Sequence, residues 1–290
     1  MTMRLAEISR EKPVLIAGPT ASGKSALAMD LAARDGRVVV NADALQVYGC
    51  WRALTARPTV ADEAALPHAL YGHVACGQAY SVGHWLRAVT AVLAEHGPKV
   101  VIVGGTGLYF AALTAGLADI PQTPAAVRIQ ADALRKTDLG AMIAALDPAT
   151  RARVDLANPM RVQRAWEVQK TTGKGLAAWQ AGTPAPALAL ADCDAVVLRP
   201  DVAALNARID QRLDQMVAVG VLEEVRANLP QWNATAPWAQ AIGAASFVAH
   251  LQGALTLTDA VQDAKIATHQ YAKRQRTWMR NRMAAWRECA

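Results

Sequence analysis

The sequence contains few cysteines, and none of them stands in a spacing typical of a metal site. Cys50, Cys76, Cys193 and Cys289 are far apart, with no C-x-x-C pair. The cysteines therefore support neither a zinc site nor a disulfide framework. This cysteine usage fits a reducing cytosol.

Apolar runs long enough to span a membrane are also missing. Hydrophobic residues make up 53% of the chain, but none of their runs reaches the roughly 18 to 20 residues that a membrane helix needs. The N-terminal residues include Arg4, Glu7, Arg10 and Glu11 and no apolar segment of the signal-peptide type. We therefore expect a soluble, cytoplasmic protein without membrane contact.

Acidic residues are absent between Ala264 and Arg287, in a chain whose formal net charge is +6. The stretch instead interleaves basic and aromatic residues, among them Lys273, Arg276, Arg280, Tyr271 and Trp278. Such a basic helix suits contact with a nucleic-acid backbone. A calmodulin-target helix or a membrane-surface helix would show a similar pattern.

The clearest motif is a glycine-rich loop between an apolar run, Val14 to Ala17, and a helical stretch, Ala26 to Arg34. In the spacing G-x-x-x-x-G-K-[ST], backbone N–H groups surround a phosphate at a helix N-terminus, the lysine adds positive charge, and the last hydroxyl can hold Mg²⁺. We therefore predict a diphosphate or polyphosphate ligand, with Ser25 as the metal ligand. The predicted phosphate-binding residues are Gly18, Pro19, Thr20, Ala21, Ser22, Gly23, Lys24 and Ser25.

Two further buried strands are predicted at residues 37–41 and 99–103. Asp43 follows the first strand, and Gly104 to Gly107 follow the second. Because ligands bind beyond the carboxyl ends of parallel strands, Asp43 is a candidate acid or base near the loop. Its alternative role is to cap the next helix. The second strand lacks the terminal acid typical of phosphoryl-transferring P-loop enzymes, which disfavours a motor-type ATPase.

The middle of the chain is predicted to be helical, with helix starts at Thr123, Asp147 and Asn158, each followed by proline. A strand at residues 194–199 then returns to the sheet, and a helix over residues 201–219 follows. The predicted fold class is therefore α/β, with a P-loop NTPase-like parallel sheet flanked by helices and an all-helical insertion domain. The core comprises residues 1–120 and 188–290, and the insertion domain comprises residues 121–187.

Arginines on the predicted helices have two possible interpretations. Arg208 and Arg212 share one helix face and could clamp a diphosphate, or that face could be solvated. Arg128, Arg161 and Arg164 lie on helices of the insertion, where isolated arginines are usually exposed surface.

Seven motifs in order resemble the bacterial tRNA dimethylallyltransferase family, also called tRNA isopentenyltransferase. They are GPTASGKS (18–25), NADALQVY (41–48), GGTGLY (104–109), NPMRVQRAWE (158–167), LNARIDQRLDQM (205–216), AIG (241–243) and YAKRQRTW (271–278). The resemblance covers nearly the whole chain. It implies transfer of a dimethylallyl group from its diphosphate to the exocyclic amine of the adenosine 3′-adjacent to the anticodon of tRNA.

The resemblance also implies roles for particular residues. Asp43 would be the base, Thr106 would position the acceptor or the bridging oxygen, and Arg128 would stabilise charge on the diphosphate. Arg208 and Arg212 would share that last role. The implied tRNA contacts are Asp43, Ala44, Leu45, Gln46, Thr106, Arg128, Met160, Arg161, Val162, Gln163, Arg164, Lys273, Arg276 and Arg280.

The implied partners are dimethylallyl diphosphate and the anticodon stem-loop of tRNA, with Mg²⁺ on Ser25 and a monomeric chain. The sequence departs from the family at Ala44, where serine is usual, and at Ala244, where tyrosine is frequent. One alternative is a P-loop small-molecule or nucleoside kinase, which leaves the basic C-terminal stretch without a role. A second is a non-catalytic RNA-binding protein with a relic phosphate loop.

Overall fold

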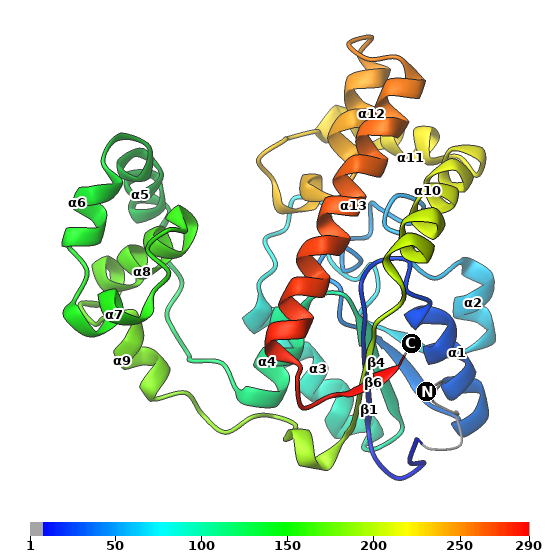
Figure 1. The fold of residues 1–290 in the computed structure, drawn as a ribbon, viewed down its shortest axis with the longest axis horizontal. Coiled ribbons are helices and arrows are strands. Elements are labelled where there is room, and N and C mark those ends of the chain that lie inside the picture. The colour runs from blue at the N-terminus through cyan, green and yellow to red at the C-terminus, as the bar shows by residue number, and fades with distance from the viewer. Residues whose placement is uncertain (1–7, 290) are drawn as a thin grey trace. The chain divides into compact units, whose positions relative to one another are not determined.

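The computed structural model describes residues 8–289, and within them one parallel sheet organises the fold (Figure 1). The strand order is β3-β2-β4-β1-β5-β6. The strands are β1 (Val14–Ala17), β2 (Val38–Asn41), β3 (His68–Ala69), β4 (Val100–Gly104), β5 (Asp194–Leu198) and β6 (Arg287–Cys289). The predicted parallel sheet is confirmed. The edge strands β3 and β6 were not predicted, because two or three residues are too few to show a pattern.

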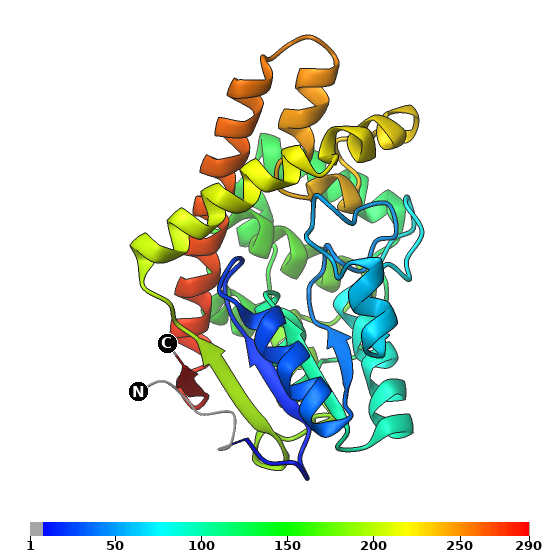
Figure 2. The same cartoon turned by 90° about the vertical axis from the view of Figure 1, so that its right-hand side faces the viewer.

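Helices cover both faces of this sheet. Alternating strand side chains divide the core, because successive residues of a strand point to opposite faces. On one face, Ile16 and Val103 pack against α1 (Lys24–Asp35). On the other, Leu15 and Ile102 pack with side chains of α3 (Val82–His96), α4 (Gly107–Ala115) and α13 (Leu257–Arg282). Figure 2 shows α1 in front of the sheet.

A second apolar cluster lies beyond the carboxyl ends of the strands (Figures 1 and 2). It joins α10 (Val202–Ala218), α11 (Val221–Asn228), α12 (Ala244–Leu251) and part of α13 to the loop around Trp51. The Trp51 indole donates a hydrogen bond to the Trp238 carbonyl at 2.8 Å. The predicted helix over residues 201–219 is confirmed, with Asp201 as its N-cap. The short helix α2 (Val60–Ala65) precedes β3.

Residues 115–187 form a separate compact unit, whereas the described residues 8–114 and 188–289 form the other. The division therefore falls after Thr114, six residues before the predicted boundary at 120. The helices of the separate unit are α5 (Ala125–Thr137), α6 (Leu139–Ala144), α7 (Pro148–Arg153), α8 (Pro159–Thr172) and α9 (Leu176–Ala181).

Two of the three predicted helix caps in this unit are confirmed. Asp147 caps α7, and the Asn158 side chain accepts hydrogen bonds from the first turn of α8. Thr123 was wrongly predicted as a cap, because Pro124 occupies the N-cap position of α5. The Thr123 hydroxyl instead accepts a hydrogen bond from Arg164 Nη1 at 2.8 Å.

The cysteines correct another prediction. Cys50 and Cys76 form a disulfide, which the sequence analysis, finding no support for a disulfide framework, did not predict. The pair meets because Tyr48 and Val74 form a parallel bridge just before the two cysteines. In the described residues no cluster of three or more metal-ligating side chains occurs.

None of the described helices, between residues 8 and 289, combines the length and the apolar character needed to cross a bilayer. The prediction that no signal peptide is present rests partly on residues 1–7, which lie outside the described residues.

Candidate active site

The glycine-rich loop joins β1 to α1 as the sequence predicts. The Gly18 N–H donates a hydrogen bond to the Gly104 carbonyl at 3.3 Å, which fixes the loop's start on β4. A Cβ on Gly18 would lie 2.5 Å from Ser22 Oγ and 3.2 Å from Leu198 Cβ, so a side chain here would displace the Ser22 hydroxyl. Gly23 starts α1 with a φ of +90°, a conformation that favours glycine. The loop geometry therefore depends on both glycines of the motif.

Two side chains of this loop are suited to an anion. Ser22 is only 8% exposed, and its hydroxyl makes no hydrogen bond with any described residue. A buried polar group without a partner usually indicates a missing ligand or water. Lys24 Nζ donates to the Pro19 carbonyl at 3.2 Å, and burial lowers the pKa of Lys24 to about 8, an effect that Asp43 partly opposes. A bound anion would favour the charged lysine.

Ser25 lies exposed in the first turn of α1, directly after Lys24. Its hydroxyl is therefore accessible to a cation that also contacts a bound diphosphate. Mg²⁺ commonly takes one or two protein oxygens and completes its shell with phosphate and water oxygens. The residues present fit Mg²⁺ bound in this way.

Asp43 is held at the carboxyl end of β2 by its neighbours. Its Oδ1 accepts a hydrogen bond from Leu45 N at 3.0 Å, and Asn41 Oδ1 accepts one from Asp43 N at 2.8 Å. Thr106, at the end of β4, accepts a hydrogen bond from Ala44 N at 2.9 Å through its hydroxyl. The two candidate catalytic residues therefore belong to one hydrogen-bonded corner, and Thr106 helps to shape the segment that carries Asp43.

Arg212 is the arginine of α10 that reaches the phosphate loop. Its guanidinium donates a hydrogen bond to the Thr20 hydroxyl. Burial lowers the pKa of Arg212, whereas the negative charge of Asp43 raises it. Arg208 lies on the exposed side of the same helix. Of the two arginines predicted to clamp a diphosphate, the structure brings only Arg212 to Thr20.

Gln275 links the phosphate loop to the loop after β4. Its Oε1 accepts a hydrogen bond from Thr20 N at 2.9 Å, and its Nε2 donates one to the Gly105 carbonyl at 3.0 Å. The sequence analysis did not single out Gln275. The signal was a polar residue within the buried stripe of α13, which otherwise holds Ala264, Thr268, Ala272 and Met279.

A small cavity lies beside these residues. It has a volume of about 50 Å³, and Thr20, Asp43 and Arg212 contribute polar groups to its wall. Its apolar lining comprises Leu45, Leu54, Leu213, Met216 and Ile242, and the hydroxyl-bearing Thr55 and Thr268 also line it. Tyr271, whose pKa burial raises, also lines it. The cavity therefore joins an anion-binding end and a carboxylate to an apolar chamber.

Gln46 and Ala44 belong to the same segment but contact protein groups. Gln46 Nε2 donates hydrogen bonds to the carbonyls of Thr55 and Ala56, at 2.8 Å and 3.0 Å. Its amide thus supports the loop that contains Leu54. The backbone N–H of Ala44 donates a hydrogen bond to the Thr106 hydroxyl. The Ala44 side chain lacks the hydroxyl of the serine that is usual at this position in the family that the sequence resembles.

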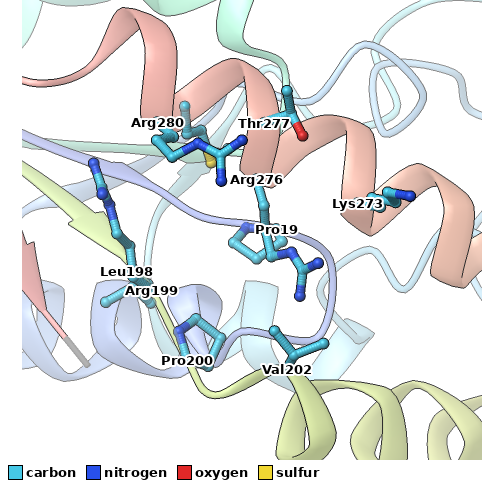
Figure 3. A pocket seen from close by; sticks show the side chains of 10 residues that line it. Pro19, Leu198, Arg199, Pro200, Val202, Lys273, Arg276, Thr277 and Arg280 are labelled. Carbon is cyan, nitrogen blue, oxygen red and sulfur yellow. The ribbon is translucent and has the colours of Figure 1, made fainter.

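A larger, basic pocket of about 330 Å³ lies beside Pro19 of the phosphate loop (Figure 3). Lys273, Arg276 and Arg280 of α13 line it, together with Arg199, which pairs with Glu288 at 2.7 Å. Its apolar lining comprises Pro19, Leu198, Pro200, Val202 and Met279. The cations predicted to bind RNA thus gather beside the phosphate loop.

Within the separate helical unit, Glu167 organises the arginines. Glu167 is 2% exposed, and its Oε2 lies 3.2 Å from Arg128 Nη2 and 3.8 Å from Arg164 Nη1. Gln163 Nε2 donates to Glu167 Oε1 at 2.8 Å. A buried carboxylate thus holds the two arginine side chains at the surface of this unit.

Two residues predicted to contact tRNA lie inside this unit. Val162 and Gln163 are 0% and 3% exposed, because they face the core that contains Trp166. Their side chains therefore pack within the protein, which does not favour the predicted contact of these side chains with tRNA. Met160 and Arg161 are exposed, and Arg164 is half-buried.

The fold and the site define a P-loop α/β protein that can hold a diphosphate next to a carboxylate and a small apolar chamber. A family model described as IPP transferase matches residues 46–282. The chain is 62% identical over 98% of its length to a tRNA dimethylallyltransferase of Cereibacter sphaeroides, covering 91% of that protein. It is 58% identical to the tRNA dimethylallyltransferase of Dinoroseobacter shibae, covering 97% and 96% of the two chains.

A solved structure gives the same result. The full-length tRNA isopentenylpyrophosphate transferase of Bacillus halodurans matches with a TM-score of 0.67 and 30% identity, over 96% of this chain and 89% of that one. The chain belongs to the IPP transferase family. These comparisons support the transferase prediction and give the kinase alternative no support.

Proposed function

We propose that this protein transfers a dimethylallyl group from dimethylallyl diphosphate to the exocyclic amine of the adenosine 3′-adjacent to the anticodon of tRNAs. The cavity beside the phosphate loop carries this proposal, because Thr20, Asp43 and Arg212 share it with five apolar side chains. A diphosphate with a short hydrocarbon tail has this combination of charge and apolar surface. The family assignment supports the same reaction.

The phosphate loop would bind the leaving group. Loop N–H groups, the free Ser22 hydroxyl and Lys24 would contact the diphosphate, and Arg212 would add charge from α10. Mg²⁺ on Ser25 would neutralise part of the diphosphate charge. When the bond between C1 and the bridging oxygen breaks, its electron pair goes to the diphosphate. Positive groups fixed before the reaction stabilise that charge without reorganisation.

Asp43 would accept the proton of the attacking amine. As the amine nitrogen bonds to C1, it must lose one proton, since the ring delocalises its lone pair and makes it a poor nucleophile. A positioned carboxylate typically contributes about 10² to 10⁴ in rate. The hydrogen bond from Leu45 N leaves the second carboxylate oxygen, Oδ2, for the amine. Thr106 would position the acceptor base or the bridging oxygen.

The basic residues would bind the RNA. Lys273, Arg276 and Arg280 present cations on α13, and Arg128, Met160, Arg161 and Arg164 would contribute from the helical unit. The target base must leave its stack, which costs less in a single-stranded anticodon loop. We propose that the protein acts as a cytoplasmic monomer, where tRNA is available.

A donor test separates this proposal from the kinase alternative. The purified protein is incubated with unmodified tRNA, Mg²⁺ and either labelled dimethylallyl diphosphate or γ-labelled ATP. We expect label on the RNA from the first donor and none from the second. Phosphate transfer from ATP without prenyl transfer would overturn the proposal.

A further inference from the structure

The lining of the small cavity beside the phosphate loop has polar residues and apolar residues. Its polar end holds Thr20 and Arg212, and its apolar lining includes Met216, one helical turn beyond Arg212 on α10. Four helical residues rise about 6 Å. Because Arg212, Leu213 and Met216 all line the cavity, its wall follows α10 over about one helical turn.

This length and volume match one isoprenyl unit. A group of the size of water or methyl takes about 10 to 15 Å³ on this measure of volume, so the cavity of about 50 Å³ holds three to five such groups. A dimethylallyl chain has five carbons. A geranyl chain has ten, and its second isoprenyl unit would meet Met216.

The other apolar walls are fixed more tightly. Leu54 N donates to Glu224 Oε2 at 2.8 Å. A Cβ on Gly243, next to Ile242, would lie 3.2 Å from Ala264 and 3.6 Å from Leu54. Met216, in contrast, is unbranched and is the most exposed member of its stripe, at 6% against 0% for Leu205 and Ile209. Shortening the Met216 side chain therefore enlarges the cavity, whereas the walls at Leu54 and Ile242 are held in place by their neighbours.

We infer that Met216 sets the length of the prenyl chain that this enzyme accepts. The inference rests on the proposed function, and it assigns Met216 as a residue that determines specificity. The exchange of bonds is unchanged with geranyl diphosphate: the amine nitrogen bonds to C1, the C1–O pair leaves with diphosphate, and one proton leaves the amine. Only the chain beyond C1 differs.

The test compares dimethylallyl and geranyl diphosphate with wild type and Met216→Ala. Transfer to unmodified tRNA gives kcat/KM for each donor, and calorimetry without RNA gives each binding constant. We expect the geranyl-to-dimethylallyl ratio to rise about tenfold or more in Met216→Ala, in both measurements, because a few methylenes in an apolar pocket discriminate by this amount. Ile209→Ala, on the same buried stripe but outside the cavity, should keep the wild-type ratio.

The outcomes separate the two proposals. An unchanged ratio in folded Met216→Ala, or an equal rise in Ile209→Ala, would overturn the role of Met216. Failure of wild type to transfer either chain would overturn the proposed function, whereas the binding ratio would still report on the cavity wall. If Met216→Ala does not fold, Met216→Val removes less volume and should shift the ratio in the same direction.

Discussion

Gln275 Oε1 accepts a hydrogen bond from Thr20 N at 2.9 Å. Through its Nε2 the same side chain donates to the Gly105 carbonyl, so one buried amide connects the phosphate loop to the loop that carries Thr106. Because Gln275 belongs to α13, the helix with the basic residues is tied directly to the phosphate loop. This contact spans 255 residues of sequence.

Gln275→Glu should impair catalysis more than folding. The carboxylate can still accept from Thr20 N, but it cannot donate to the Gly105 carbonyl and places negative charge near the diphosphate. We expect KM for the donor to rise about tenfold, since the lost amide–carbonyl hydrogen bond contributes about 0.5 to 1.5 kcal/mol and the new carboxylate repels the diphosphate. Donor titrations measure this, with Gln270→Glu on the exposed face of α13 as the control. Equal effects of the two variants would exclude a positioning role.

Asp43→Asn should keep binding and lose turnover. The amide oxygen can still accept from Leu45 N, so the loop geometry is retained, but the amide cannot accept the amine proton. We expect kcat to fall about 10² to 10⁴-fold, the usual contribution of a general base. Single-turnover transfer and separate binding assays for diphosphate and tRNA distinguish the two effects. A variant with unchanged kcat would remove Asp43 as the base.

We expect the affinity for diphosphate to depend on pH through the protonation of Lys24. In the free protein its pKa is lowered to about 8 by burial, so the charge is lost as the pH rises through that value. A diphosphate restores the proton; binding near pH 8 should therefore take up about half a proton from this group, and almost none near pH 6. Calorimetry in buffers of different ionisation enthalpy measures the uptake.

Lys24→Arg provides the control for this measurement, because its guanidinium stays protonated over the whole range. The ligand's own proton changes occur with both proteins and cancel in the comparison. Equal proton uptake by wild type and Lys24→Arg would show that Lys24 is already charged without a ligand.

The basic residues of α13 predict a salt dependence for tRNA binding. Reversal of charge at Arg276 and Arg280 should weaken binding and reduce the slope of log affinity against log salt by about one for each lost phosphate contact. Filter binding at several salt concentrations measures the slope. Arg226→Glu changes an arginine that is 59% exposed elsewhere and should leave the slope unchanged. An affinity of wild type that does not vary with salt would contradict the RNA-binding role.

The Cys50–Cys76 disulfide predicts a loss of stability on its removal. The bond closes a loop with a sequence separation of 26 residues, and restricting such a loop in the unfolded chain contributes about 3 kcal/mol. Urea unfolding should therefore show Cys50→Ser/Cys76→Ser destabilised by this amount. Reductant should destabilise wild type equally and leave the double variant unchanged. No effect of reductant on wild type would contradict the prediction.

The positions of some site residues could be predicted from the sequence because the fold places ligands at the carboxyl ends of parallel strands. Lys24 and Asp43 follow parallel strands at their carboxyl ends, so their approach could be predicted from the order of strand, loop and helix. The choice between Arg208 and Arg212 depends on the rotation of α10 about its axis. That rotation is set by packing against α13, which a sequence pattern does not contain.

The features that the sequence did not reveal depend on long-range packing. Gln275 accepts its hydrogen bond from Thr20, which lies 255 residues earlier in the sequence. Cys50 meets Cys76 because of the Tyr48–Val74 bridge. Val162 and Gln163 matched a family motif, but their burial follows from how α8 packs against α5 in the helical unit. The motif therefore identified this helix without showing which of its side chains face outward.

The most direct measurement is the identification of the modified nucleoside in tRNA after incubation with dimethylallyl diphosphate and Mg²⁺. Nuclease digestion followed by mass spectrometry should find the dimethylallyl group only on the adenosine 3′-adjacent to the anticodon. A transcript with guanosine at that position should remain unmodified. Modification of another nucleoside, or of both transcripts equally, would contradict the proposed reaction.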